Sequence, residues 1–216
     1  MHGILTSTAN KYFHSTQAAG INHTPIPPID VLMGSDTYLN MFQPTTNNGN
    51  SQIWAVGDDN SGIGVKRTWI KPDFSNIPAG RTFLTAILNI TPTGDLSSNA
   101  RTMYVHRCLR DVNELQATWN IWKTSNNWGT AGCSNSTTDY DGAVTLGTMT
   151  QPASPTLNTA LQMTLSASEI QKLYDGTYTN NGIILFVDTQ NTDAIIYASS
   201  TDATSAYRPF ITITFE

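Results

Sequence analysis

Charged residues are scarce in this chain of 216 residues, and their scarcity limits what the protein can bind. Only 12% of the residues are Asp, Glu, Lys or Arg, and the formal net charge is −5. The basic residues form no cluster, whereas a protein that binds nucleic acid needs a basic surface to release counterions from the phosphates. We therefore predict no nucleic-acid partner.

Long apolar runs are also missing. No stretch reaches the roughly 20 apolar residues that a helix needs to cross a bilayer. The first residues, MHGILTSTANKYFHS, do not join a basic region to an apolar one, as a secretory signal would. We expect no contact with a membrane. We also expect the chain to be made in the cytoplasm without a signal peptide.

Cysteine and histidine, which carry much of enzyme chemistry, are rare. Cys108 and Cys133 have no zinc-ligand spacing; we expect two free thiols, although a disulfide between them stays open. Of four histidines only His106 lies beyond the first 28 residues, and a lone histidine within a strand is more often structural than a base beside a nucleophile. The motifs G-x-S-x-G and H-E-x-x-H are absent. We therefore predict no enzyme and no cofactor.

Aspartates in turn-rich segments leave two alternatives open. Glycoside hydrolysis needs two carboxylates at a set separation, and four residues are available: Asp139, Asp141, Asp188 and Asp193. The segments 58–62 (DDNSG) and 139–141 (DYD) offer oxygen ligands for Ca²⁺ without the spacing of an EF-hand. Isolated aspartates in loops are usually turn formers. Hydrolysis is thus a minor alternative, and the presence of a metal stays undecided.

Aromatic residues gather in the stretch 117–141, ATWNIWKTSNNWGTAGCSNSTTDYD, which holds three of the five tryptophans among Asn, Thr, Ser and Gly. One interpretation is that these rings cap the open end of a β core, with ring edges left wet for their N–H groups. The other is an exposed platform of Trp122, Trp128 and Tyr140 that stacks on a glycan. Because aromatic residues usually serve burial first, we favour capping, most clearly for Trp119.

Residues 1–29 are predicted to form an extended arm. They show no sustained periodicity and end near Pro25–Pro28 (PIPP), which fixes an extended backbone. Such a segment cannot bury enough surface to fold alone, so we expect it to dock on its own domain, a sister subunit or another protein. The candidate docking residues are Tyr12, Phe13, Ile21, Pro25, Ile26 and Pro28.

Residues 30–216 have the pattern of one β domain. Short β-prone runs alternate with turn residues, and the expected strands are 36–42, 52–56, 65–70, 81–91, 102–109, 161–165, 182–188, 194–199 and 209–215. In the run 81–91, Leu84, Ala86, Leu88 and Ile90 share one face. Ser166 and Glu169 form a capping box that starts one short helix over 167–175, and residues 124–158 are expected to be irregular. We predict an all-β, antiparallel two-sheet jelly-roll sandwich.

Five segments, in this order, resemble a known family: DTYL (36–39), RTWIKPDFSNIPAG (67–80), ATWN (117–120), YDGTYTNNGIILF (174–186) and YASSTDATSAYRPFITITF (197–215). The order is similar to that of DNRLRE-type domains, over about residues 30–216. Pro72 departs from the family pattern, which has an aromatic residue there, and Asp202 stands where Glu is common. The resemblance implies a non-catalytic jelly-roll module of the kind found beside carbohydrate-active enzymes, on cell surfaces and in phage virions.

Two hypotheses of function follow. In the first, the chain is a phage virion structural protein, a capsid decoration or surface appendage. It is made in the host cytoplasm, located on the virion surface, homo-oligomeric, and docked through its arm to other virion proteins such as the major capsid protein. In the second, it is a carbohydrate-binding module that recognises host glycans through Trp122, Trp128 and Tyr140.

Overall fold

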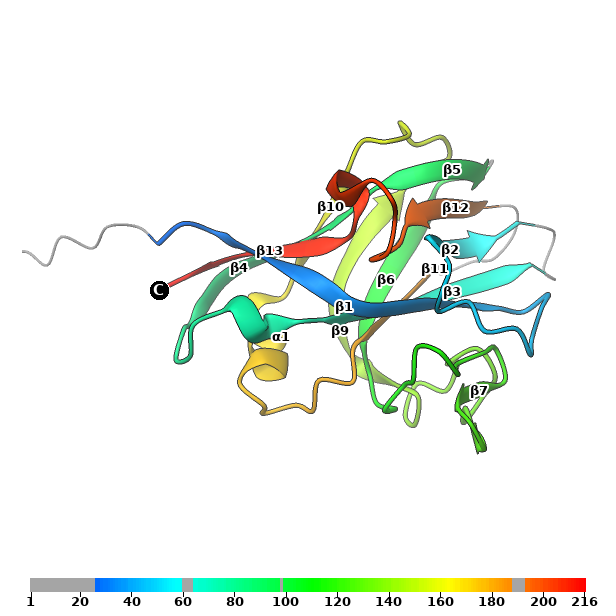
Figure 1. The fold of residues 1–216 in the computed structure, drawn as a ribbon, viewed down its shortest axis with the longest axis horizontal. Coiled ribbons are helices and arrows are strands. Elements are labelled where there is room, and N and C mark those ends of the chain that lie inside the picture. Colours follow the sequence, from blue (N-terminus) through cyan, green and yellow to red (C-terminus); the bar gives the residue numbers. More distant parts are fainter. Residues whose placement is uncertain (1–25, 60–63, 98, 188–192) are drawn as a thin grey trace, which may run out of the picture.

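The computed structural model describes residues 26–59, 64–97, 99–187 and 193–216, and these are mostly β-strand (Figure 1). The strands are β1 (Ile29–Asn40), β2 (Ile53–Asp58), β3 (Val65–Pro72), β4 (Phe83–Ile90), β5 (Pro92–Ser97), β6 (Arg101–Cys108), β7 (Ile121–Lys123), β8 (Asn126–Asn127), β9 (Tyr140–Gln151), β10 (Leu161–Leu165), β11 (Ile183–Val187), β12 (Asp193–Ala198) and β13 (Phe210–Phe215). The helical elements are η1 (Phe74–Asn76), α1 (Ala167–Tyr174) and η2 (Ser205–Tyr207). The prediction of an all-β protein with one short α-helix is confirmed for the described residues.

Eight strands close into an antiparallel barrel in the order β1-β13-β4-β10-β9-β6-β11-β3, with β3 pairing back to β1. Strand β1 makes the closure, because Ile29–Leu32 pair with β13 while Met33–Asn40 pair with β3. A bulge between Met33 and Ser35 separates the two halves. Figure 1 shows β1 passing from β13 across to β3. Where the sequence predicted two separate sheets, this crossing strand joins the sheet into one circuit.

Backbone pairing around the barrel is least extensive between β9 and β10. These strands share one register pair, Leu165 with Gly147. A Cβ atom on Gly147 would lie 2.7 Å from both the Thr164 carbonyl oxygen and a methyl carbon of Leu165. Glycine therefore permits the close backbone approach that completes the barrel.

A three-stranded extension branches from the barrel. Strand β2 pairs with the start of β3 through Gly57 and Asp58, then with β12, and β12 pairs with β5. Trp54 of β2 and Tyr197 of β12 are fully buried in the main core cluster, and their rings stack with centroids 4.6 Å apart. The extension therefore shares the main core.

Two structural details follow the sequence closely. The Ser166 side chain accepts a hydrogen bond from the Glu169 N–H at 3.4 Å, and helix α1 buries Ile170 and Leu173 against the core. Strand β3 ends at Pro72, as the missing N–H of proline requires. No helix in the described part of the chain is long and apolar enough to cross a membrane.

Three expectations about strands were wrong in detail. Leu84 is 54% exposed, because the β13–β4 register shifts between Thr214 and Phe215 and turns Phe83 inward in its place. Residues 124–158 were expected to be irregular, but strand β9 (Tyr140–Gln151) lies within them. Strand β1 begins at Ile29 and not near residue 36. Local bulges and cross-strand partners, which a single sequence does not display, cause these differences.

Candidate functional site

The stretch 117–141, here named the Trp-rich loop, folds over one end of the barrel. It contains the β7–β8 hairpin and contributes to a second core cluster, distinct from the main one. The buried members of this cluster are Leu39, Trp69, Cys108, Val112, Ala117, Trp128, Cys133 and Ile184. Because strands β1, β3, β6 and β11 all supply side chains to this cluster, the loop is anchored to the barrel.

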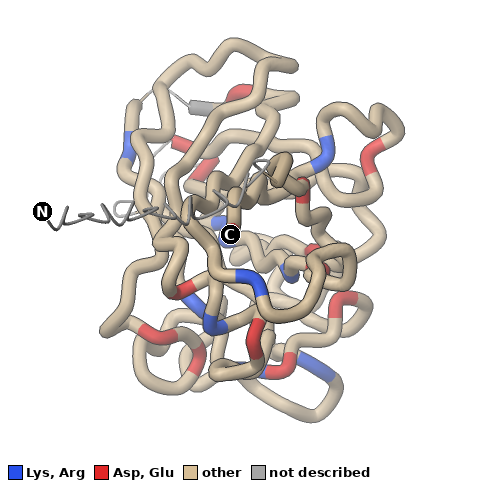
Figure 2. The backbone as a smooth tube through the Cα atoms, turned by 90° about the vertical axis from the view of Figure 1, so that its left-hand side faces the viewer, with Lys and Arg blue, Asp and Glu red and all other residues tan. Residues whose placement is uncertain are grey.

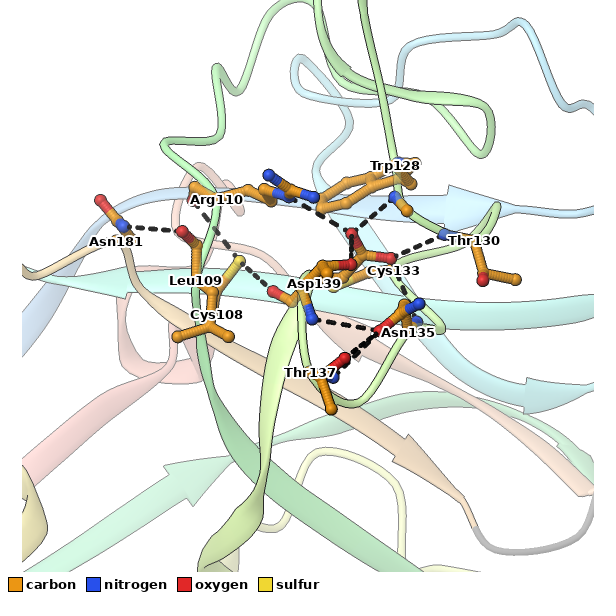
Figure 3. Close-up of polar contacts among 12 residues, drawn as sticks. Cys108, Leu109, Arg110, Trp128, Thr130, Cys133, Asn135, Thr137, Asp139 and Asn181 are labelled. Carbon is orange, nitrogen blue, oxygen red and sulfur yellow. Dashed lines mark hydrogen bonds and ion pairs between the residues drawn. The ribbon is translucent and has the colours of Figure 1, made fainter.

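Asp139 organises the loop (Figure 3). Its fully buried carboxylate accepts hydrogen bonds from the backbone N–H groups of Gly129 (2.7 Å), Thr130 (3.0 Å) and Asn135 (3.1 Å). The Arg110 Nε lies 3.3 Å from the same carboxylate. Both oxygens are thus occupied by donors, which is the environment of a structural carboxylate.

The three aromatic residues predicted to form a glycan platform do not present open ring faces together. Trp128 is 5% exposed, and its indole N–H donates to the Thr118 carbonyl oxygen at 2.9 Å. Tyr140 is half-buried, with its ring centroid 5.3 Å from that of Phe186. Trp122 is half-buried, with the Lys123 ammonium 4.3 Å from its ring centroid. The geometry therefore favours the capping interpretation for Trp128, because its polar edge is satisfied inside the second cluster.

Trp119 is held by a close approach of the backbone. Gly132 has a φ of +76°, and a Cβ atom there would lie 2.5 Å from the Trp119 ring. The Gly132 N–H donates to the Trp119 carbonyl oxygen at 2.6 Å. Glycine is required at this position by conformation and by space.

The aspartates considered as a hydrolytic pair have arginine partners where the structure describes them. Asp139 faces Arg110, as above. Asp141 pairs with the Arg107 guanidinium at 2.7 Å, which lowers the pKa of this carboxyl. Asp193 is fully buried and pairs with Arg101 at 2.8 Å. Asp188 lies outside the described residues. These ion pairs hold chain segments together. Each of the three described carboxylates, those of Asp139, Asp141 and Asp193, is paired with an arginine.

The two candidate calcium segments do not converge on a cation site within the described chain. There, no group of three or more His, Cys, Asp or Glu side chains is placed to hold a metal. In the DYD segment the carboxylates make the contacts just given. In the DDNSG segment Asp59 pairs with Lys66 at 2.5 Å, and residues 60–62 lie outside the described part.

His106 and the cysteines are packing residues. The ring of His106 is nearly parallel to that of Phe186, and its Nδ1 lies 2.9 Å from the Asp141 carbonyl oxygen. Cys108 and Cys133 are free and buried. Burial raises the pKa of the Cys133 thiol well above its ordinary value, so this thiol is a poor nucleophile.

Of the predicted docking arm, Tyr12, Phe13, Ile21 and Pro25 lie outside the described residues. Ile26 and Pro28 are described, and both are exposed immediately before β1. The arm therefore joins the barrel through a short exposed segment.

Asp36, in the DTYL segment, is a buried acid that links two loops. It is 2% exposed and accepts a hydrogen bond from the Ser200 N–H at 2.5 Å, while its own N–H donates to the Glu114 carboxylate at 2.9 Å. Burial raises the pKa of Asp36 to about 6. The sequence marked this residue only through the family resemblance.

A cleft of about 440 Å³, here named the α1 cleft, lies where the β1 bulge, the end of β3, η1 and the end of α1 meet. Side chains that line it include Ser35, Lys71, Asp73, Phe74, Tyr174 and Asn180. Sequence reasoning did not select these residues as a site. The available signal was that 71–80 and 174–182 belong to two of the segments that carry the resemblance.

Hydrogen bonds fix the walls of the α1 cleft. The Tyr174 hydroxyl donates to the Pro78 carbonyl oxygen at 2.6 Å, and Asn180 donates to that of Pro72 at 2.9 Å. One carboxylate oxygen of Asp73 accepts from the Ser75 N–H at 3.0 Å, which lowers the pKa of Asp73. The ring centroids of Phe74 and Tyr174 lie 6.1 Å apart with an interplanar angle of 73°. The result is a rigid aromatic corner beside polar groups.

No protein-family model matches the chain, and no curated protein is similar to it.

Proposed function

We propose that the chain is a non-catalytic structural protein of a phage virion, a capsid decoration or surface appendage, that docks through residues 1–28. The supporting observation is the junction between arm and barrel. Strand β1 begins at Ile29, directly after the exposed residues Ile26 and Pro28. The arm is thus attached where it can reach a partner without interrupting the β1 pairing.

The closed circuit supports the same proposal. Sheet proteins often associate through unpaired strand edges, but each of the eight barrel strands has a neighbour on both sides. Within the described residues β5, at the end of the extension, pairs with β12 alone. Association away from that one edge would use side-chain surfaces or an appended segment such as the arm. Assignment of the barrel to DNRLRE-type domains and homo-oligomerisation belong to this proposal.

Low surface charge is compatible with packing into an assembly. Figure 2 shows acidic and basic positions scattered along the backbone, with long uncharged stretches between them. The charged side chains of Asp139, Asp141 and Asp193 pair with arginines as described. A partner would therefore meet a surface with little charge to desolvate.

Deletion of residues 1–28 tests the proposal. We expect the truncated protein to keep its circular dichroism spectrum and thermal midpoint, because β1 is intact, and to lose incorporation into phage particles in a complementation experiment. The matched control replaces the arm with a Gly/Ser segment of equal length, which keeps the tether but removes the candidate docking side chains. Truncated protein present in particles at the full-length copy number would contradict the proposal.

A further inference from the structure

The α1 cleft is an open depression with the volume of a small-ligand site. Its volume of about 440 Å³ lies in the range of roughly 300–1,000 Å³ that is usual for such sites. Three chain segments far apart in sequence, 34–35, 71–74 and 173–180, supply its lining. The walls are held by the Tyr174 and Asn180 hydrogen bonds, so the cleft is formed before any ligand arrives.

The aromatic corner supplies a rigid apolar surface. The Tyr174 ring is fixed by its hydroxyl bond and by Phe83, whose ring centroid lies 4.9 Å away. Phe74 stands nearly at right angles to Tyr174 and is half-buried. A ligand in the cleft therefore meets an aromatic wall that loses little entropy on binding, and an apolar ligand face can pack on it.

The polar groups of the cleft are of opposite charge and remain available. Within the described residues, the Lys71 ammonium and the Ser35 hydroxyl have no hydrogen-bond or ion-pair partner, and Asp73 uses one carboxylate oxygen for the Ser75 N–H. A ligand that carries charge of one sign only would be attracted by one of these side chains and repelled by the other. Neighbouring hydroxyl groups suit both, because a hydroxyl donates to a carboxylate and accepts from an ammonium.

We propose that the α1 cleft binds a neutral glycan. One sugar ring packs its apolar face on Phe74, with Tyr174 at the edge of the sugar, while its hydroxyl groups donate to Asp73 and accept from Lys71. This site is separate from the Trp-rich loop and independent of the arm. Its failure would leave the assembly proposal untouched, and the reverse also holds.

A titration of the full chain tests the proposal. Neutral hexasaccharides of glucose, mannose, galactose, xylose and N-acetylglucosamine are added up to about 10 mM while amide chemical shifts are followed by NMR. We expect at least one to bind with a Kd on the order of 1 mM or tighter, with the largest shifts at residues 71–75 and 173–180. Absence of saturable binding by all five would overturn the proposal.

Substitutions then test whether the glycan binds in the α1 cleft. Lys71→Gln and Asp73→Asn are each expected to weaken binding about tenfold or more, and Phe74→Ala to abolish it while Phe74→Tyr keeps it. Trp122→Ala and Lys123→Gln, on the Trp-rich loop, are matched controls expected to bind as the wild type does. Thermal midpoints within a few degrees of wild type verify folding. Loss of binding in Trp122→Ala with retention in the cleft variants would overturn the assignment, as would selective binding of uronic-acid hexasaccharides.

Discussion

Asp139 shows how one buried carboxylate can order the backbone of a loop that also has an apolar cluster. The Trp-rich loop has short strands and many polar residues, yet three of its backbone N–H groups converge on this carboxylate. A buried donor without a partner costs about 1–3 kcal/mol. The order of the loop therefore depends strongly on this one residue.

We predict that Asp139→Ala lowers the free energy of unfolding by about 3 kcal/mol, since three N–H groups and Arg110 lose their acceptor. Urea unfolding followed by tryptophan fluorescence measures the change. The control is Asp111→Asn, because Asp111 is an exposed carboxylate paired with Lys123 and should change stability by less than about 1 kcal/mol. Equal effects of the two substitutions would contradict this role of Asp139.

Asp36 predicts a distinct pH dependence. Its folded pKa of about 6 lies above the ordinary value of 3.8, so the folded state binds the proton more tightly than the unfolded state. The sign follows from linkage: this carboxyl contributes stability below pH 4, and that contribution is lost as the pH rises to 6.

Asp36→Asn keeps an acceptor for the Ser200 N–H and removes the titration. We expect this variant to gain up to about 3 kcal/mol relative to wild type between pH 4 and pH 7, from a shift of about two pKa units. Denaturant unfolding of both proteins across this range gives the difference. A difference that stays constant with pH would show that Asp36 does not titrate there.

The roles of single residues in the candidate sites could be predicted only in part from the sequence. Burial of Trp128 follows from the usual preference of large rings, and the structure agrees. The role of Asp139 could not be foreseen, because its partners are backbone groups and an Asp in a loop commonly caps a turn. The α1 cleft combines Ser35, Lys71 and Tyr174, whose proximity depends on the barrel topology.

Among the elements, the β9–β10 contact has the tightest geometric requirement. Gly147→Ala places a Cβ atom against the Thr164 backbone, and we predict a loss of about 1–3 kcal/mol in unfolding free energy as the strands separate. Gly34→Ala is the control, since a Cβ atom there would lie 3.4 Å from the Asp73 Cβ, an ordinary contact. Thermal and urea unfolding compare the two. A Gly147→Ala protein as stable as wild type would show that the contact can relax.

Strand β9 also shows why element prediction succeeded in some places and failed in others. Strands with buried alternation, such as Ile211, Ile213 and Phe215 of β13, were recognised. In β9, Leu146 is the one buried apolar residue, and the position of the strand depends on its pairing with β6. A strand that is ordered by its neighbours carries little hydrophobic signal of its own.

Across the whole molecule, strands differ in the number of neighbouring strands with which they pair. Strand β11 pairs with both β3 and β6, whereas within the described residues β5 pairs only with β12. We predict that amide hydrogens of β11 exchange by global unfolding and that those of β5 exchange faster through local opening. Hydrogen exchange followed by NMR makes the comparison. Equal protection of the two strands would mean that the extension and the barrel open as one unit.

The order in which the strands are synthesised has a consequence for the closed circuit. Strand β13 follows every other barrel strand along the chain, and it lies between β1 and β4. While the ribosome is still translating, β1 and β4 each wait with one unpaired edge, and such edges invite intermolecular pairing. The barrel can therefore close only once β13 has emerged from the ribosome, and the edges of β1 and β4 that face it stay unpaired until then.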